Sequence, residues 1–270
     1  EAGAGNILTS FLDTLLRIVF DWFAGIFPNG PGFVDKGTNS ESLKADNFYA
    51  GTSGKFNTSA DADAKWYLGY SNKSLVPDDV TNGEYYIGGY IAPENAFTNV
   101  VEGVIDDMKV RCIAVKDGAN GETVLFGTID CIGITNGDIR EIRAMFMEEL
   151  IKRFPDKKIA SVNVCSTHTH SCVDTEGLWT DFPGKILRNR KKNLKKNFDL
   201  EQGTDKEYMI FLKKSVVNAF FTAIENMCDG ELFFAQKDIG SDYFRNTNRP
   251  SATGIVTDVT RLRFVPFDKT

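Results

Sequence analysis

The chain has 270 residues, of which 42% are hydrophobic and 25% charged, a composition typical of a soluble globular protein. A chain of this length can bury a core without disulfide bonds, as one large domain or as one domain with an appendage. The net charge of −6 argues against nucleic acid as a partner, and the five cysteines form no C-x-x-C pair, which excludes a structural zinc finger.

The first residues, EAGAG, resemble the mature terminus that a signal peptidase leaves, so we expect a secreted or cell-surface location; the alternative is an arbitrary boundary. Residues 7–27 carry apolar side chains at helical spacing, and Asp13, Arg17 and Asp21 share the polar face. Three charges within this segment argue against a membrane span. We therefore expect an amphipathic helix within residues 1–30, which either docks on the domain or lies on a lipid surface.

A linker or irregular loops are expected over residues 31–64, which are rich in Ser, Asn, Gly, Asp and Lys. The main domain then covers residues 65–270. Its first clear pattern is a pair of strands at 109–115 and 123–134, joined by a glycine-rich turn and expected to be antiparallel. Cys112, Cys131 and Cys165 lie in apolar, strand-like segments, which favours buried free thiols.

A strand–helix–strand unit follows. The sequence NGD at 136–138 begins a helix whose apolar stripe contains Ile142 and Phe146, and KKIASVNVC at 157–165 is the next strand. The two strands that flank this helix should be parallel, with a right-handed crossover.

The rest of the chain predicts a basic segment, a long helix and two more strands. Six of the ten residues at 188–197 are basic, which indicates a solvated loop or, alternatively, contact with anionic lipid. A helix at about 206–227 precedes strands at 230–239 and 259–267. The predicted fold is α/β, with a mixed, partly parallel sheet flanked by helices and an N-terminal amphipathic helix. The chain ends soon after the last strand, and we expect the domain to continue beyond it.

The only two histidines of the chain, His168 and His170, lie in CSTHTHSC, residues 165–172. They follow the carboxyl end of the second parallel strand, the edge at which open α/β sheets bind ligands. In an extended segment, side chains two positions apart face the same space, and imidazole is the usual nitrogen ligand of zinc. A metal site is therefore predicted, with two hydrogen-bonded loop histidines as the alternative. Further ligands would come from beyond residue 270 or from nearby side chains, namely Cys165, Cys172, Asp174 and Glu176.

The sequence NVCSTHTHSCVDTEGLW resembles the THTHSGP signature of the neutral/alkaline, non-lysosomal ceramidases. Five other segments resemble that family in the same order, and the resemblance covers about residues 66–266. The segments are YIGGYIAP, IDDMKVRCIAV, VLFGTIDCIGITNGDIREIRAMF, FRNTNRPS and VTRLRFV. The resemblance implies the N-terminal part of a catalytic domain that cleaves the amide bond of ceramide with one Zn²⁺ ion.

By this resemblance, His168 is a zinc ligand and His170 lines the reaction centre. Gly89 makes a backbone contact near the head of the lipid substrate, and Arg249 is an active-site arginine. Zinc in such a site acidifies a water molecule and polarises the amide carbonyl, while His170 and Arg249 stabilise the oxyanion.

The sequence also departs from the family. Cys172 and Val173 stand where the family has Gly-Pro, and the family's remaining zinc ligands and active-site serine come later than this chain reaches. The remainder of the same hydrolase is therefore an expected partner. Two other hypotheses stay open: a different H-x-H metallohydrolase, and a non-catalytic binding module that has kept the fold.

Overall fold

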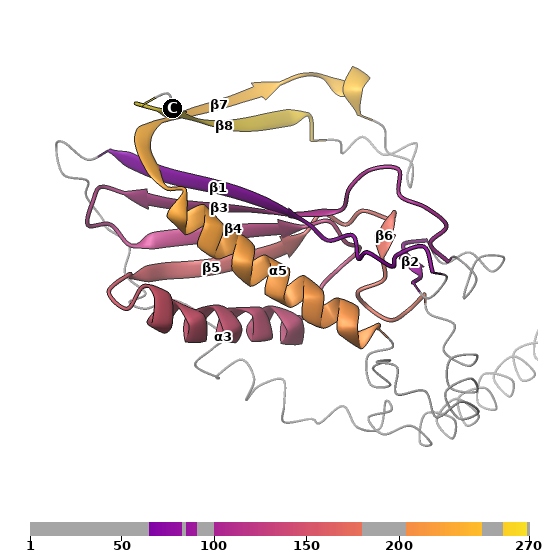
Figure 1. Ribbon diagram of the computed structural model, residues 1–270. Helices are drawn as coiled ribbons and strands as arrows, with labels where there is room; N and C mark the ends of the chain where they lie inside the picture. The colour runs from indigo at the N-terminus through magenta and orange to yellow at the C-terminus, as the bar shows by residue number, and fades with distance from the viewer. Residues whose placement is uncertain (1–64, 83–84, 91–99, 180–203, 245–255, 269–270) are drawn as a thin grey trace, which may run out of the picture.

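The computed structural model describes residues 65–82, 85–90, 100–179, 204–244 and 256–268 (Figure 1). The predicted N-terminal helix, the linker at 31–64 and the basic segment at 188–197 lie outside these residues. The described part is a mixed α/β structure, as the sequence predicted, in which two long helices pack on a six-stranded sheet. Its strand at 66–74 was not predicted. Neither of these helices is long and apolar enough to cross a membrane.

The order of strands in the main sheet is β5-β4-β3-β1-β7-β8. Their bounds are β1 Trp66–Ser74, β3 Lys109–Asp117, β4 Thr123–Ile129, β5 Ile159–Ser166, β7 Cys228–Asp238 and β8 Asp258–Pro266. The β3–β4 pair is antiparallel and the β4–β5 pair is parallel, which confirms both predicted pairings. The strand predicted at 123–134 is too long, because residues after Ile129 leave the sheet and enter a buried loop.

Helix α3, Asn136–Arg153, connects the two parallel strands, and α5, Lys206–Glu225, follows later in the chain. Both begin at a side-chain cap: Thr135 accepts a hydrogen bond from the backbone of Asp138, and Asp205 accepts one from that of Tyr208. Helix α5 packs on β1, β3 and β4, and α3 packs against α5 (Figure 1).

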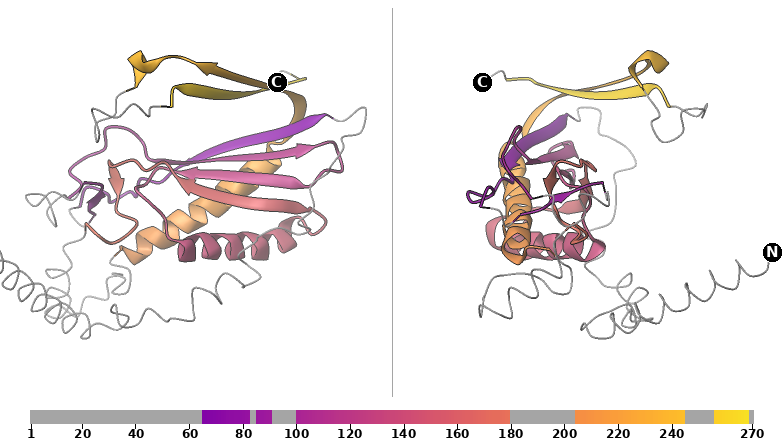
Figure 2. Two further views of the ribbon diagram at one scale, coloured as in Figure 1. Left: turned by 180° about the vertical axis from the view of Figure 1, so that it is seen from behind. Right: turned by 90° about the vertical axis from the view of Figure 1, so that its right-hand side faces the viewer.

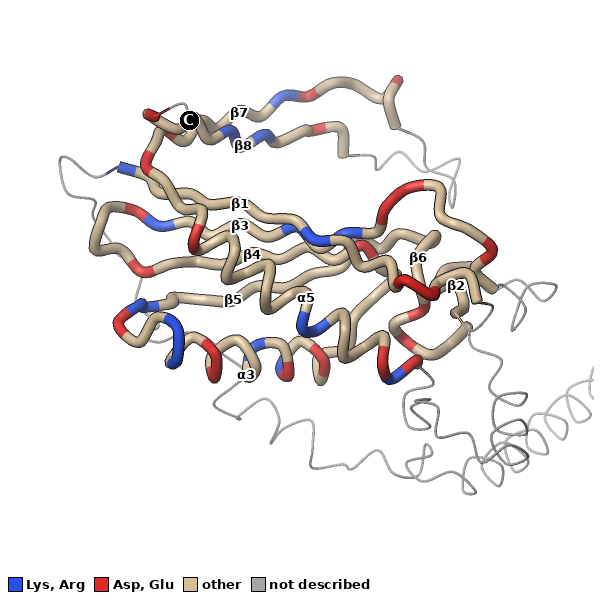
Figure 3. The backbone as a smooth tube through the Cα atoms, viewed as in Figure 1, with Lys and Arg blue, Asp and Glu red and all other residues tan. Residues whose placement is uncertain are grey.

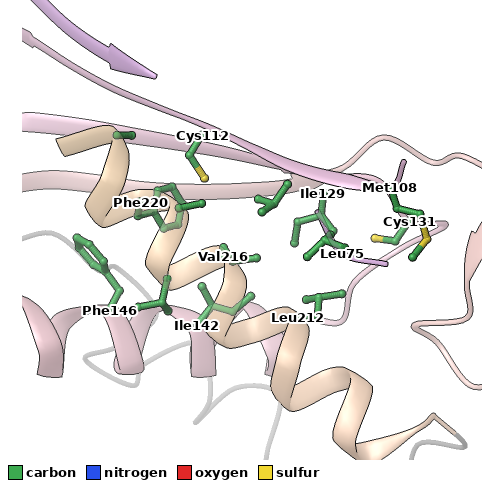
Figure 4. Close-up of a cluster of buried hydrophobic side chains, with 14 of the residues drawn as sticks. Leu75, Met108, Cys112, Ile129, Cys131, Ile142, Phe146, Leu212, Val216 and Phe220 are labelled. Atoms are coloured by element: carbon green, nitrogen blue, oxygen red, sulfur yellow. The ribbon is translucent and has the colours of Figure 1, made fainter. Parts of the chain in front are cut away.

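The core lies between these helices and one face of the sheet. The predicted stripe of α3 buries Ile142 and Phe146, and the ring of Phe146 lies edge to face with that of Phe220 of α5 (Figure 4). Close approach of α5 to the sheet requires glycine at position 69, where an added Cβ would lie 1.9 Å from the carbonyl oxygen of Ala223.

The opposite face of the sheet is not covered by a described helix. In β4, alternate residues such as Leu125 are fully buried, whereas Phe126 on the other face is 46% exposed. Cys165 of β5 lies on the same uncovered face as Phe126, near Thr128, and is exposed. The prediction of a buried thiol is therefore wrong for Cys165, although it is confirmed for Cys112 and Cys131.

The outer ribbon of β7 and β8 extends away from the helices (Figure 2). Paired residues share a face, so Phe234 and Leu262 lie on one face, and Phe233 and Arg263 lie on the other. All four side chains are exposed within the described structure. A 3₁₀ turn at Ser241–Tyr243 follows β7.

A second, two-stranded sheet lies at the end of the main sheet where β4 and β5 finish (Figure 1). It pairs β2, Ile87–Gly88, with β6, Cys172–Val173, in antiparallel register. The backbone N–H of Asp174 extends the pairing by donating to the carbonyl of Tyr86 at 2.8 Å. This small sheet joins the segment around Gly89 to the segment that follows the two histidines.

Candidate metal and substrate site

The position of His168 is fixed by the two parallel strands. The backbone N–H of Thr167 still donates to the carbonyl of Ile129 at the end of β4. The chain then turns, and His168 adopts a φ of 59°, in the left-handed region. Its Nδ1 lies 2.7 Å from the carbonyl oxygen of Ile132, in the loop that follows β4. The site thus stands at the carboxyl ends of both parallel strands, as predicted.

The contact with Ile132 determines which nitrogen of His168 is available. A carbonyl oxygen only accepts hydrogen bonds, so Nδ1 carries the proton and Nε2 presents a lone pair. Metal-binding histidines typically hold the second ring nitrogen in this way, because the hydrogen bond fixes both tautomer and orientation. The sequence offered no signal for this partner, because it is a backbone carbonyl.

The Nε2 atoms of His168 and His170 lie 3.4 Å apart, with the rings edge to face and their centroids separated by 4.8 Å. Both imidazoles therefore face one space. A zinc ion bound at about 2.0–2.1 Å to Nε2 of His168 would therefore lie in the space that His170 also faces. We expected an extended backbone to bring the two rings to the same side. His168 instead has a left-handed backbone conformation, so the rings meet for a different reason.

Gly89 lies directly against His170. A Cβ added at Gly89 would come 2.8 Å from the Cβ of His170 and 3.1 Å from its carbonyl oxygen. The next residue, Tyr90, places its ring 4.3 Å from the His170 ring. The structure thus brings together three of the four predicted site residues, namely Gly89, His168 and His170; Arg249 lies outside the described residues.

The four side chains considered as further ligands have other surroundings. Asp174 is buried, and its carboxylate accepts hydrogen bonds from three backbone N–H groups of the loop that follows, including that of Trp179 at 3.1 Å. The Glu176 carboxylate lies against Gly133, and Cys165 faces outward from β5. In the described part of the chain, no three His, Cys, Asp or Glu side chains are grouped as a metal site.

Two thiols near the site, those of Cys131 and Cys172, are buried. Burial raises the pKa of Cys172 to about 11 and that of Cys131 to about 12. Beside these thiols, the described structure brings two imidazoles together at the candidate site.

A cavity of about 660 Å³ lies beside His170. One part of its wall is polar: Arg111 donates through Nη1 to both carboxylate oxygens of Asp130, at 2.9 and 2.8 Å. Aliphatic side chains form much of the remaining wall, among them Val76, Val80, Ile87, Val101, Val104 and Met108. The sequence did not point to this cavity, because its walls come from five separate segments of the chain.

No protein-family model matches the chain, and no curated protein matches it in sequence. Among solved structures, the chain is similar to the neutral ceramidase from Pseudomonas aeruginosa, with a TM-score of 0.53 and 15% sequence identity. A second similar structure is a ceramidase complexed with C2, with a TM-score of 0.51 and 14% identity. Each match covers 76% of this chain but only 30% and 29% of the ceramidase chains. At this level of identity, the similarity shows that the fold is ceramidase-like.

Proposed function

We propose that the protein is a zinc-dependent amide hydrolase of the neutral ceramidase type, which cleaves the N-acyl linkage of ceramide or a related N-acyl lipid. The observation that carries the proposal is the convergence of the Nε2 atoms of His168 and His170 beside a cavity with aliphatic walls. The ceramidase-like fold supports it.

In this proposal His168 holds the zinc through Nε2, while its Nδ1–H stays on the carbonyl of Ile132. The bound zinc would supply a water of lowered pKa and polarise the amide carbonyl. His170 faces the same space and can donate a hydrogen bond to the oxyanion, and Arg249 has the same role by its resemblance to the family arginine. Gly89 exposes its backbone to the substrate head, since no side chain intervenes.

The cavity supports an N-acyl lipid as the substrate. Its volume is within the range that small-molecule sites occupy, and its aliphatic wall suits a hydrocarbon chain. The Arg111–Asp130 ion pair places hydrogen-bonding groups in the same cavity, which suits the hydroxyl or amide groups of such a lipid. We further propose that the remainder of the hydrolase supplies the other zinc ligands, and that the enzyme acts at the cell surface or after secretion.

Elemental analysis and amide turnover test the proposal together. With the remainder of the hydrolase present, we expect one zinc per protein and hydrolysis of a fluorescent N-acyl sphingosine. His168→Ala should lose both the bound zinc and the hydrolysis. Cys165→Ser is the matched control, because this exposed thiol lies three residues earlier on β5 and should be dispensable. Full zinc occupancy in His168→Ala would refute the ligand assignment. Stoichiometric zinc without amide turnover would instead favour a different metallohydrolase or a binding module.

A further inference from the structure

The loop from Val101 to Met108, which leads into β3, holds an apolar tip in solvent. Its two ends are fixed: Val101 and Met108 are buried, the N–H of Val101 donates to Tyr85, and the carbonyl of Met108 accepts from Leu75. Between them, Val104 is 49% exposed and Ile105 is 99% exposed. Ile105 is the most exposed large apolar side chain in the part of the chain that the structure describes. A loop that is anchored at both ends therefore holds this side chain in solvent.

This tip stands at the cavity beside His170. Val104 and Ile105 both line that cavity, together with His170. Tyr90, on the β2 side, is 82% exposed while its ring contacts the His170 ring. Figure 1 shows the loop running close to β2 and β6. Exposed apolar side chains from two segments thus border the candidate site.

The charges of the loop indicate what kind of surface it fits. Residues 101–108 contain three acidic residues, Glu102, Asp106 and Asp107, and no basic residue (Figure 3). Asp107 is engaged by Ser74 at 2.6 Å and by Lys109 at 3.6 Å, while all three acidic side chains remain exposed. An anionic lipid surface would repel this loop, whereas a zwitterionic surface would not.

We propose that Val104, Ile105 and Tyr90 form a lip that enters the interfacial layer of a neutral, zwitterionic lipid bilayer. Aliphatic and tyrosine side chains both favour that layer, where a hydrocarbon body meets a polar boundary. The lip would place the cavity against the membrane, so that an N-acyl lipid moves from the bilayer to the site without crossing water. The proposal relies on the proposed function for its substrate, but membrane binding is measured independently of catalysis.

Tryptophan reporters test where the protein touches the bilayer. Ile105→Trp and Ile151→Trp each add one indole to the three tryptophans of the chain. Ile151 is the matched control, because it is 68% exposed on α3, and this helix lies away from the 101–108 loop (Figure 1). With vesicles of brominated phosphatidylcholine, the additional emission at position 105 should be quenched and that at position 151 should not. Equal quenching at both positions, or none at position 105, would overturn the proposal.

Serine variants test what the contact contributes. Ile105→Ser should weaken co-sedimentation with phosphatidylcholine vesicles by about tenfold, because one large aliphatic side chain is withdrawn from the interface. Ile151→Ser should bind like the unmodified protein. Hydrolysis of a long-chain N-acyl lipid in vesicles should fall with binding in Ile105→Ser, whereas hydrolysis of a water-soluble short-chain analogue should be unchanged.

Lipid preference, thermal stability and turnover complete the test of the lip. Tighter binding to phosphatidylserine than to phosphatidylcholine vesicles would overturn the charge argument. A melting temperature lowered by several degrees in Ile105→Ser would show that polypeptide covers this position, which also overturns the proposal. If all forms bind vesicles as expected but none hydrolyses either substrate, the proposed function fails while the lip stands.

Discussion

Replacing Gly89 by alanine should displace His170. The added Cβ would lie 2.8 Å from the Cβ of His170, 3.1 Å from its carbonyl oxygen and 3.2 Å from its Cα. These are atoms at the base of the side chain and in the backbone, so rotation of the imidazole cannot relieve the contact. The pairing of Gly88 with Cys172 holds the two segments together, which limits how far they can separate.

The size of the effect follows from these distances. The Cβ–Cβ separation must grow by about 0.6 Å to reach the 3.4 Å of ordinary van der Waals contact. Such overpacking typically costs about 1–3 kcal/mol of unfolding free energy. A misplacement of 1 Å at a reaction centre can cost about a hundredfold in rate, so a shift of about half that size should lower kcat/KM roughly tenfold.

Imidazole NMR provides a direct assay, because the chain has only two histidines. In ¹H–¹⁵N long-range spectra, the signals of His170 should move in Gly89→Ala. His168 should keep the Nδ1–H tautomer that its contact with Ile132 imposes. Gly103→Ala is the matched control, because no atom lies within 4 Å of its added Cβ. Unchanged His170 signals and an unchanged melting temperature in Gly89→Ala would refute the reasoning.

Four further predictions concern the site, the packing and the thiols. Arg249→Lys keeps the charge but loses the planar guanidinium fork, and it should lower kcat/KM at least about tenfold; unchanged kinetics would contradict its role. Gly69→Ala would place a Cβ 1.9 Å from the backbone oxygen of Ala223, and urea denaturation should show a loss of about 3 kcal/mol or more. In the native chain, Ellman's reagent should modify the exposed thiols of Cys165 and Cys228 at pH 8 and reach the three buried thiols only on unfolding. Burial raises the pKa of two of those thiols to about 12 and that of the third to about 11, from an ordinary value of 9.0. Between pH 9 and about 11 the unfolded state therefore loses these protons while the folded state keeps them, so the unfolding free energy should fall as the pH rises through this range.

The sequence by itself determined the local elements of the main domain. Alternating and helical apolar spacing located β3, α3, β5 and α5, because each of these elements buries one continuous stripe against the same core. The strand–helix–strand order also required β4 and β5 to be parallel, which placed the two histidines at their carboxyl ends. These conclusions depend on residues that are close together in the chain, and the spacing of apolar residues predicts the structure of such segments well.

Only the tertiary structure decided how distant segments meet. The β2–β6 pairing brings Gly89 to His170, and the loop after β4 turns the carbonyl of Ile132 toward His168, although neither contact has a local sequence signal. The exposure of Cys165 also depends on tertiary structure. Its strand has an apolar sequence, which predicted burial, but no described helix covers the face of the sheet on which Cys165 lies. Periodicity shows that a residue belongs to a strand, but burial and close approach depend on which other segment packs against each face, and long-range packing alone determines that.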